Sequence, residues 1–204
     1  MNCLGKGLND AGHDGYALIV KEAELAIHRR LGAPESHLLT VQANLACTYG
    51  ELGQLDRALQ LERDVYHASL RLLGEEDEET LRAAYNYVNA LVSLKRFEEA
   101  KALMRKTMPV AQRVLGASHE LTLRMRGVYA ESLCKDPGVT LDDLREAVTT
   151  LEETERTARR VFGSEHPLTK GIERTLRDSR AALSAREGDG VSAVRGALEA
   201  MNAT

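Results

Sequence analysis

The stretch NLACTYGELGQLDRA, residues 44–58, decides the fold, because a stretch of the same design, NYVNALVSLKRFEEA, follows 42 residues later at 86–100. Small residues, Ala58 and Ala100, stand where a second helix would begin after a short turn, and they let two antiparallel helices approach closely. Around the second stretch, apolar residues are spaced by three, four and three, as on one face of a helix: Leu81, Ala84, Val88 and Leu91. Each stretch therefore predicts a helical hairpin.

The 42-residue period extends along the chain. Leu31-Gly32, Leu73-Gly74 and Leu115-Gly116 recur at that spacing, and Phe162-Gly163 follows after 47 residues. The five extra residues, 135–139, read as a turn-forming insertion. We therefore predict an all-α fold, a superhelical solenoid of antiparallel hairpins in a single domain, 1–204. Its units are predicted at 1–32 (partial, with 2–12 as an incomplete first helix), 33–74, 75–116, 117–163 and 164–187 (partial), with a capping helix at 190–201 after a break at 188–190.

Composition and charge narrow the class of protein. The chain is 43% hydrophobic and 28% charged, typical of a soluble folded protein, and its formal net charge is only −4 with no basic stripe, which argues against nucleic acid. No stretch approaches the 18 apolar residues of a membrane span. The three cysteines, Cys3, Cys47 and Cys134, have no CxxC spacing, so neither a disulfide framework nor a zinc site is expected. These features predict a cytoplasmic location.

Catalytic and metal-binding patterns are missing from the sequence. There is no HExxH, GxSxG or GxxxxGK[ST], so we expect neither an enzyme nor a cofactor. Among the six histidines, His119 and His166 occupy equivalent repeat positions, which makes them loop or cap residues and not metal ligands. No metal site is predicted.

Several short motifs resemble those of one repeat family. Leu115-Gly116, His119-x-x-Thr122-Leu123 and His166-Pro167-Leu168-Thr169 lie in loops, and Asn44-Leu45-Ala46 followed by Gly53 and Ala58 lies in a hairpin. Together they resemble tetratricopeptide repeats of the long-period, kinesin-light-chain-like kind. The third unit departs from the pattern, since Val128-Tyr129-Ala130 replaces the Asn triplet. The resemblance implies a protein-binding array. In it, the asparagine of the Asn-Leu-Ala triplet, Asn44, and its equivalent in the next repeat, Asn86, form hydrogen bonds with a peptide backbone.

A polar face predicts where a partner would bind. In a solenoid of hairpins, the first helix of each unit lines an extended concave groove. On the helix predicted at 80–94, one face away from the apolar stripe carries Arg82, Tyr85, Asn86, Asn89 and Ser93. The corresponding groove positions in the other units are Thr40, Ala43, Asn44, Cys47, Arg124, Glu131, Arg174 and Asp178. Three arginines in this set predict a protein or peptide ligand with acidic residues beside an apolar anchor.

An alternative is a self-associating scaffold, or a spacer within a larger multidomain protein. Apolar residues near the two ends of the array could stack copies end to end or could cap the array internally: Ala17, Leu18, Val20, Val191, Val194 and Leu198.

Overall fold

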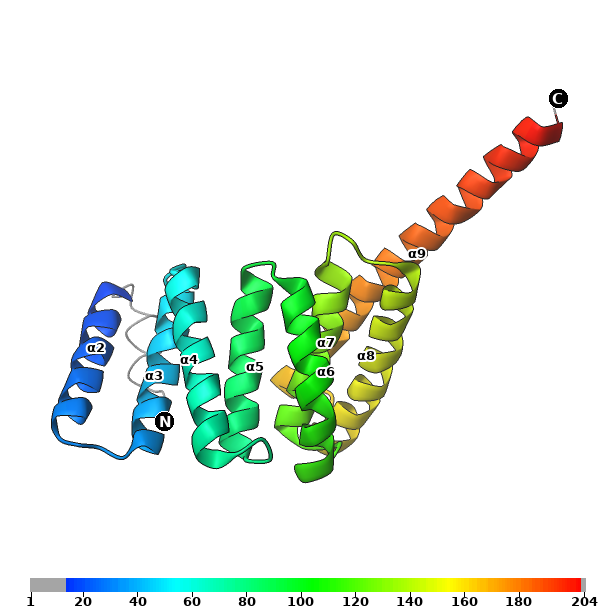
Figure 1. Cartoon of the computed structure of the whole chain (residues 1–204). Helices are drawn as coiled ribbons and strands as arrows, with labels where there is room; N and C mark the ends of the chain where they lie inside the picture. The colour runs from blue at the N-terminus through cyan, green and yellow to red at the C-terminus, as the bar shows by residue number, and fades with distance from the viewer. Residues whose placement is uncertain (1–13, 203–204) are drawn as a thin grey trace. The chain divides into compact units, whose positions relative to one another are not determined.

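The computed structural model describes residues 14–202, and side chains over 15–188. Over that range the chain is helical, without strands, which confirms the all-α prediction. Figure 1 shows the helices in chain order: α2 (Asp14–Arg30), α3 (Glu35–Glu51), α4 (Leu55–Leu73), α5 (Glu78–Ser93), α6 (Phe97–Val114), α7 (Glu120–Lys135), α8 (Leu141–Phe162) and α9 (Pro167–Asn202).

The helices of the chain group into two compact units, and the single solenoid domain over 1–204 stays a prediction. Unit 1 is Met1–Val114, with α2 to α6, and unit 2 is Leu115–Thr204, with α7 to α9. Within each unit, consecutive helices pack against each other, and in unit 1 they stand side by side in chain order (Figure 1). The division falls close to the predicted boundary between 75–116 and 117–163. A repeat array can divide at such a boundary because each repeat packs mainly on its neighbours.

The hairpin turns follow from local backbone chemistry. Gly53 ends α3 with φ 73°, in the left-handed region that glycine adopts at no steric cost. The amide of Gln54 donates to the carbonyl of Tyr49 at 2.8 Å, as in a Schellman cap. One period later, Lys95 takes the same role with φ 60°, and Arg96 donates to the carbonyl of Leu91 at 2.8 Å. The two hairpins of unit 1 therefore share one turn design.

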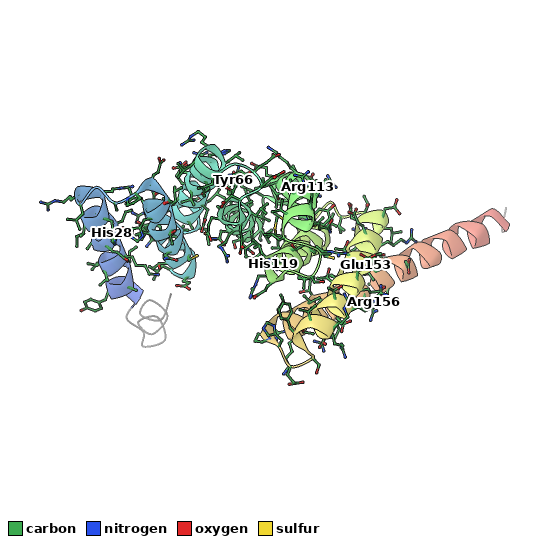
Figure 2. The ribbon with its side chains drawn as sticks, turned by 90° about the horizontal axis from the view of Figure 1, so that it is seen from below. His28, Tyr66, Arg113, His119, Glu153 and Arg156 are labelled. Atoms are coloured by element: carbon green, nitrogen blue, oxygen red, sulfur yellow. The ribbon has the colours of Figure 1, made fainter. Side chains whose placement is uncertain are left out.

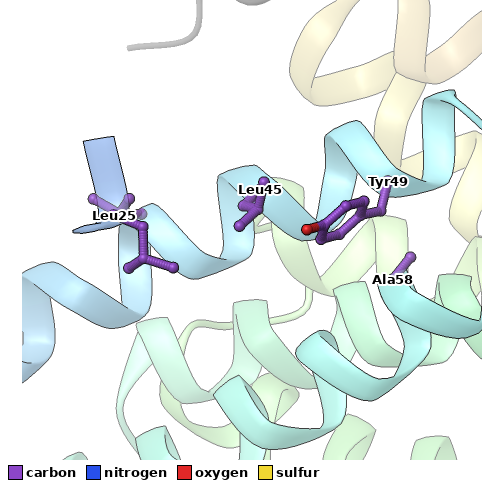
Figure 3. Packing of buried hydrophobic residues seen from close by; sticks show 5 residues of the cluster. Leu25, Leu45, Tyr49 and Ala58 are labelled. Carbon is purple, nitrogen blue, oxygen red and sulfur yellow. The ribbon is translucent and has the colours of Figure 1, made fainter. Parts of the chain in front are cut away.

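Apolar stripes form the core between the helices, as the sequence predicted. Leu81, Ala84, Val88 and Leu91 of α5 are each at most 1% exposed. Where α2 packs against the α3–α4 hairpin, side chains from all three helices form one cluster: Leu25, Val41, Leu45, Tyr49 and Ala58 (Figure 3). Ala58 and Ala100 are both buried, which fits the close approach expected at the start of each second helix.

The insertion after α7 forms a turn that restarts the chain as α8. The amide of Gly138 donates to the carboxylate of Asp136 at 2.9 Å. Thr140 then caps α8: its hydroxyl accepts from the Asp143 amide at 3.1 Å, and the Asp143 carboxylate accepts from the Thr140 amide at 2.9 Å. This capping box satisfies backbone donors that the first turn of a helix leaves open.

The predicted break at 188–190 is wrong. α9 continues without interruption from Pro167 to Asn202, so no separate capping helix follows Gly190. Glycine in a helix costs about 1 kcal/mol relative to alanine, which weakens a helix without forbidding it. The predicted incomplete helix at 2–12 lies outside the described residues. Among the described helices, none combines the length and the apolar character needed to cross a membrane.

Candidate protein-binding surface

A cavity of about 310 Å³ opens in unit 1 between α3 and α5, with α4 beneath it. Its apolar wall includes Leu39 and Ala83, and Val65 and Ser69 of α4 are buried at its base. Four of the predicted groove residues lie around it, namely Thr40, Ala43, Arg82 and Asn86. The remaining lining residues are Ser36, His37, Leu73 and Glu79.

The start of α5 positions Arg82. Asp77 caps this helix by accepting a hydrogen bond from the Glu79 amide at 2.8 Å, and Glu78 and Glu79 occupy the first turn, where the helix dipole favours negative charge. The Arg82 guanidinium lies 2.6 Å from the Glu78 carboxylate and 3.4 Å from that of Glu79. All three side chains are exposed, so these ion pairs hold Arg82 only weakly.

The asparagines of α5 differ in what their amides can offer a ligand. The Asn89 amide donates to the carbonyl of Tyr85 at 2.9 Å, and Ser93 donates to the carbonyl of Asn89 at 2.9 Å. Within the described part of the chain, the Asn86 side chain has no hydrogen-bond partner, and it lines the cavity. An amide both donates and accepts, so Asn86 is the residue suited to bind a peptide backbone.

On α3, Thr40 and Ala43 of the predicted residues line the cavity, and the Thr40 hydroxyl donates to the carbonyl of Ser36 at 3.2 Å. Asn44 uses its backbone carbonyl to accept a hydrogen bond from Lys21 at 3.2 Å. The Cys47 thiol lies 4.0 Å from a carboxylate oxygen of Glu62. Asn44, Cys47 and the half-buried Tyr85 are not part of the cavity wall.

The other predicted groove residues belong to unit 2. Arg124 donates to Glu120 at 2.6 Å, and this hydrogen bond holds the pKa of the Glu120 carboxyl below its usual value. Glu131 pairs with Lys135 at 2.5 Å, and Arg174 of α9 is exposed. One continuous groove that joins these residues to Thr40, Arg82 and Asn86 stays a prediction.

Unit 2 has its own open hollow of about 480 Å³ between α8 and α9. Charged side chains line most of it, and several pair with each other, as Arg159 does with Glu155 at 2.6 Å and Arg180 with Glu152 at 2.7 Å. Leu176 is its single apolar lining residue. The cavity of unit 1 is the better candidate because it combines apolar walls with the unpartnered Asn86 amide and the weakly held Arg82 guanidinium.

Sequence reasoning missed the contribution of α4. It assigned the groove to first helices alone, whereas Val65, Ser69 and Leu73 of the second helix also line the cavity. These three residues are four positions apart and therefore share one side of α4, a signal that the sequence contained. His37 and Glu79 at the rim were also missed.

The histidines at the start of α7 and α9 act as caps, as predicted. His119 Nδ1 accepts a hydrogen bond from the Leu121 amide at 3.3 Å, and His166 Nδ1 accepts one from the Leu168 amide at the same distance. Figure 2 shows His119 at this position. Within the residues described, no group of three or more His, Cys, Asp or Glu side chains is arranged to hold a metal ion.

Comparison with known proteins identifies the repeats. The family model described as tetratricopeptide repeat matches residues 38–79 and 80–120. These two segments are tetratricopeptide repeats. They coincide with the α3–α4 and α5–α6 hairpins, and repeats of this type generally mediate contacts between proteins. No curated protein sequence matches the chain.

Solved structures share the fold. A proposed kinesin light chain from Podosopora anserina with nearly identical TPR-like repeats is 21% identical, with a TM-score of 0.72 over 91% of this chain and 86% of that one. A variant of that protein is 20% identical, with a TM-score of 0.74 over 98% and 94%. BtubC (BKLC) from P. vanneervenii is 15% identical, with a TM-score of 0.72 over 96% and 78%. The fold of this chain therefore resembles that of kinesin-light-chain-like repeat proteins, as the sequence predicted.

Proposed function

We propose that the protein is a non-catalytic interaction module that binds an extended segment of a partner protein across α3 and α5 of unit 1. One apolar side chain of the partner enters the cavity, and a neighbouring acidic residue pairs with Arg82. The observation that carries this proposal is the combination, around one cavity, of apolar walls, an exposed guanidinium and the unpartnered amide of Asn86.

The cytoplasmic location of the protein also stays a prediction.

The energetics favour such an exchange of partners. Exposed ion pairs are worth roughly 0–1 kcal/mol, so releasing Arg82 from Glu78 costs little. A partner carboxylate can then accept two parallel hydrogen bonds from the guanidinium. Burial of one apolar side chain contributes about 1.5–3 kcal/mol. At about 310 Å³ the cavity is small for a ligand site, which suits a single anchoring side chain.

Fluorescence anisotropy with synthetic peptides tests this proposal. Each peptide carries one Leu, Phe or Trp flanked by Asp and Glu. We expect Arg82→Glu to weaken binding about tenfold or more, because it replaces an attractive charge with a repulsive one. Asn86→Ala should weaken binding roughly fivefold, the worth of about one hydrogen bond.

The matched control is Asn89→Ala on the same helix, because the Asn89 amide donates to the Tyr85 carbonyl and does not line the cavity. It should leave peptide affinity unchanged. The proposal is wrong if no peptide of the set binds the wild-type protein, or if Arg82→Glu and Asn86→Ala bind as well as the Asn89→Ala control.

Self-association is a second candidate, favoured by the outer face of α2. Tyr16, Ile19, Val20 and Ile27 are each more than half exposed. Their spacing places them along one side of the helix, and exposed apolar residues grouped in this way often mark contact sites. Of the residues predicted for this role, Val20 belongs to the exposed face, whereas Ala17 is buried and Leu18 packs on the core. Val191, Val194 and Leu198 lie in the part of α9 without described side chains.

A further inference from the structure

Glu62 stands where the other hairpins have apolar core residues. The second helix of each hairpin (α4, α6 and α8) has a buried alanine near its start, namely Ala58, Ala100 or Ala147. The residue four positions after this alanine is also buried in the core. In α6 and α8 that residue is Met104 or Leu151, each 0% exposed. In α4 it is Glu62, which is only 3% exposed. A carboxyl group therefore replaces a hydrophobic side chain in the first complete hairpin.

The Glu62 carboxyl has almost nothing to bond to. One oxygen lies 4.0 Å from the Cys47 thiol of α3, and the other has no hydrogen-bond partner among the described residues. An ionised carboxylate in such a place is strongly unfavourable, whereas the neutral acid costs much less.

Among the described residues, no hydrogen bond or ion pair brings a positive charge to the Glu62 carboxyl. Lys21 of α2, whose charge acts on the neighbouring Cys47, bonds to the Asn44 carbonyl and the Thr48 hydroxyl of α3. The other titratable groups near Cys47 on α3 are acidic, as Glu51 is. On α5, the other helix packed on α4, the charged side chains are Glu78, Glu79 and Arg82, and these three pair with one another. Burial raises the pKa of the Glu62 carboxyl to about 8. The Cys47 thiol, which lies beside one Glu62 oxygen, is never positively charged and so cannot offset the cost either.

We propose that Glu62 makes the packing of the α3–α4 hairpin depend on a proton: the hairpin packs tightly when this carboxyl is neutral and loosens when it ionises. This inference goes beyond the proposed function and does not depend on it. If the peptide site is also correct, binding weakens as the carboxyl ionises, because Ala43 and Val65 of the cavity lie one helical turn from Cys47 and Glu62.

The direction of the pH effect follows from linkage. The folded state holds the Glu62 proton more tightly than the unfolded chain, whose carboxyl titrates near 4.5. The stabilisation is complete below that pH and is lost as pH rises towards about 8. Within this window the equilibrium constant for unfolding should increase about tenfold per pH unit because of Glu62 alone.

Urea unfolding of the full chain from pH 6 to 8.5 tests the inference, with Glu62→Met as the main variant because Met104 fills the same position in α6. Tyrosine fluorescence follows unit 1, which holds every tyrosine except Tyr129. Relative to Glu62→Met, the wild-type protein should become progressively less stable as pH rises. Glu62→Gln should also lose the pH dependence, and Asp64→Asn, an exposed carboxylate on the same helix, should keep it.

Parallel pH profiles for the wild-type protein and Glu62→Met would overturn the inference. A second measurement decides the matter if the variants fold poorly. Carbon-13 NMR titration of the wild-type glutamate carboxyls should show one resonance with a midpoint near neutrality or above. If every glutamate titrates near its ordinary value, Glu62 controls nothing and the inference fails, whatever the peptide experiments show.

Discussion

Thr140 shows how a single side chain sets the start of an element. Its hydroxyl and the Asp143 carboxylate each accept a hydrogen bond from the other residue's backbone amide, directly after the insertion that interrupts the repeat. Thr and an acidic residue three positions on, at the start of a helix, form the pattern of a capping box, so the local sequence carries the signal for this cap. The burial of Glu62, in contrast, was not predicted, because its neighbours in the sequence do not distinguish it from an exposed glutamate.

Replacing Thr140 should therefore destabilise unit 2. We expect Thr140→Ala to lower the free energy of unfolding by about 1 kcal/mol, the usual worth of a helix cap. The control is Thr157→Ala on the same helix, whose hydroxyl donates to the Glu153 carbonyl in mid-helix, so its loss should be neutral or slightly favourable. Urea unfolding followed by circular dichroism measures both. Equal losses in the two variants would show that the cap contributes nothing specific.

At the scale of elements, glycine has opposite effects in two places. Gly163 ends α8 with φ 85°, a conformation that other residues adopt only with strain. Gly188 lies inside α9, and a Cβ added there would meet nothing within 4 Å beyond its chain neighbours and the surrounding backbone of its own helix. The first glycine shapes the connection between two helices, whereas the second only weakens a helix that forms in spite of it.

Paired alanine substitutions distinguish these roles. Gly188→Ala should stabilise α9 locally by roughly 1 kcal/mol, because alanine loses less backbone entropy in a helix, and should slow amide hydrogen exchange around it about fivefold. Gly163→Ala should instead destabilise unit 2 by about 1–2 kcal/mol, the cost of a left-handed backbone for a residue with a Cβ. If Gly188→Ala speeds exchange in α9, the continuous helix is not the preferred conformation there.

For the whole molecule, the number of copies in solution separates the two proposed functions. If α2 mediates self-association through its exposed apolar face, sedimentation coefficients should rise with concentration, and Ile19→Glu with Val20→Lys should abolish the rise because charges cannot be buried there. Glu24→Gln on the same helix serves as a control that keeps the apolar face. A wild-type monomer at every concentration would exclude the scaffold and leave peptide binding as the function to test.

The sequence by itself determined the hairpins, their period, the insertion at 135–139 and the capping histidines. These features depend on residues a few positions apart, so helix periodicity and capping chemistry express them within each repeat. The same local rules misled at 188–190, where two glycines predicted a break that the helix tolerates.

Only the tertiary structure decided which polar residues meet. Thr40, Arg82 and Asn86 surround one cavity. The side chains of Asn89 and Ser93 instead donate hydrogen bonds to backbone carbonyls of their own helix, α5. Of the other predicted residues, Arg124, Glu131 and Arg174 belong to unit 2. The contribution of Val65 to the cavity and the burial of Glu62 depend in the same way on packing between helices. Periodicity shows which side of a helix is polar, but it does not show which residues of the neighbouring helix lie opposite that side. The packing of one helix on the next creates both the candidate cavity and the buried position of Glu62.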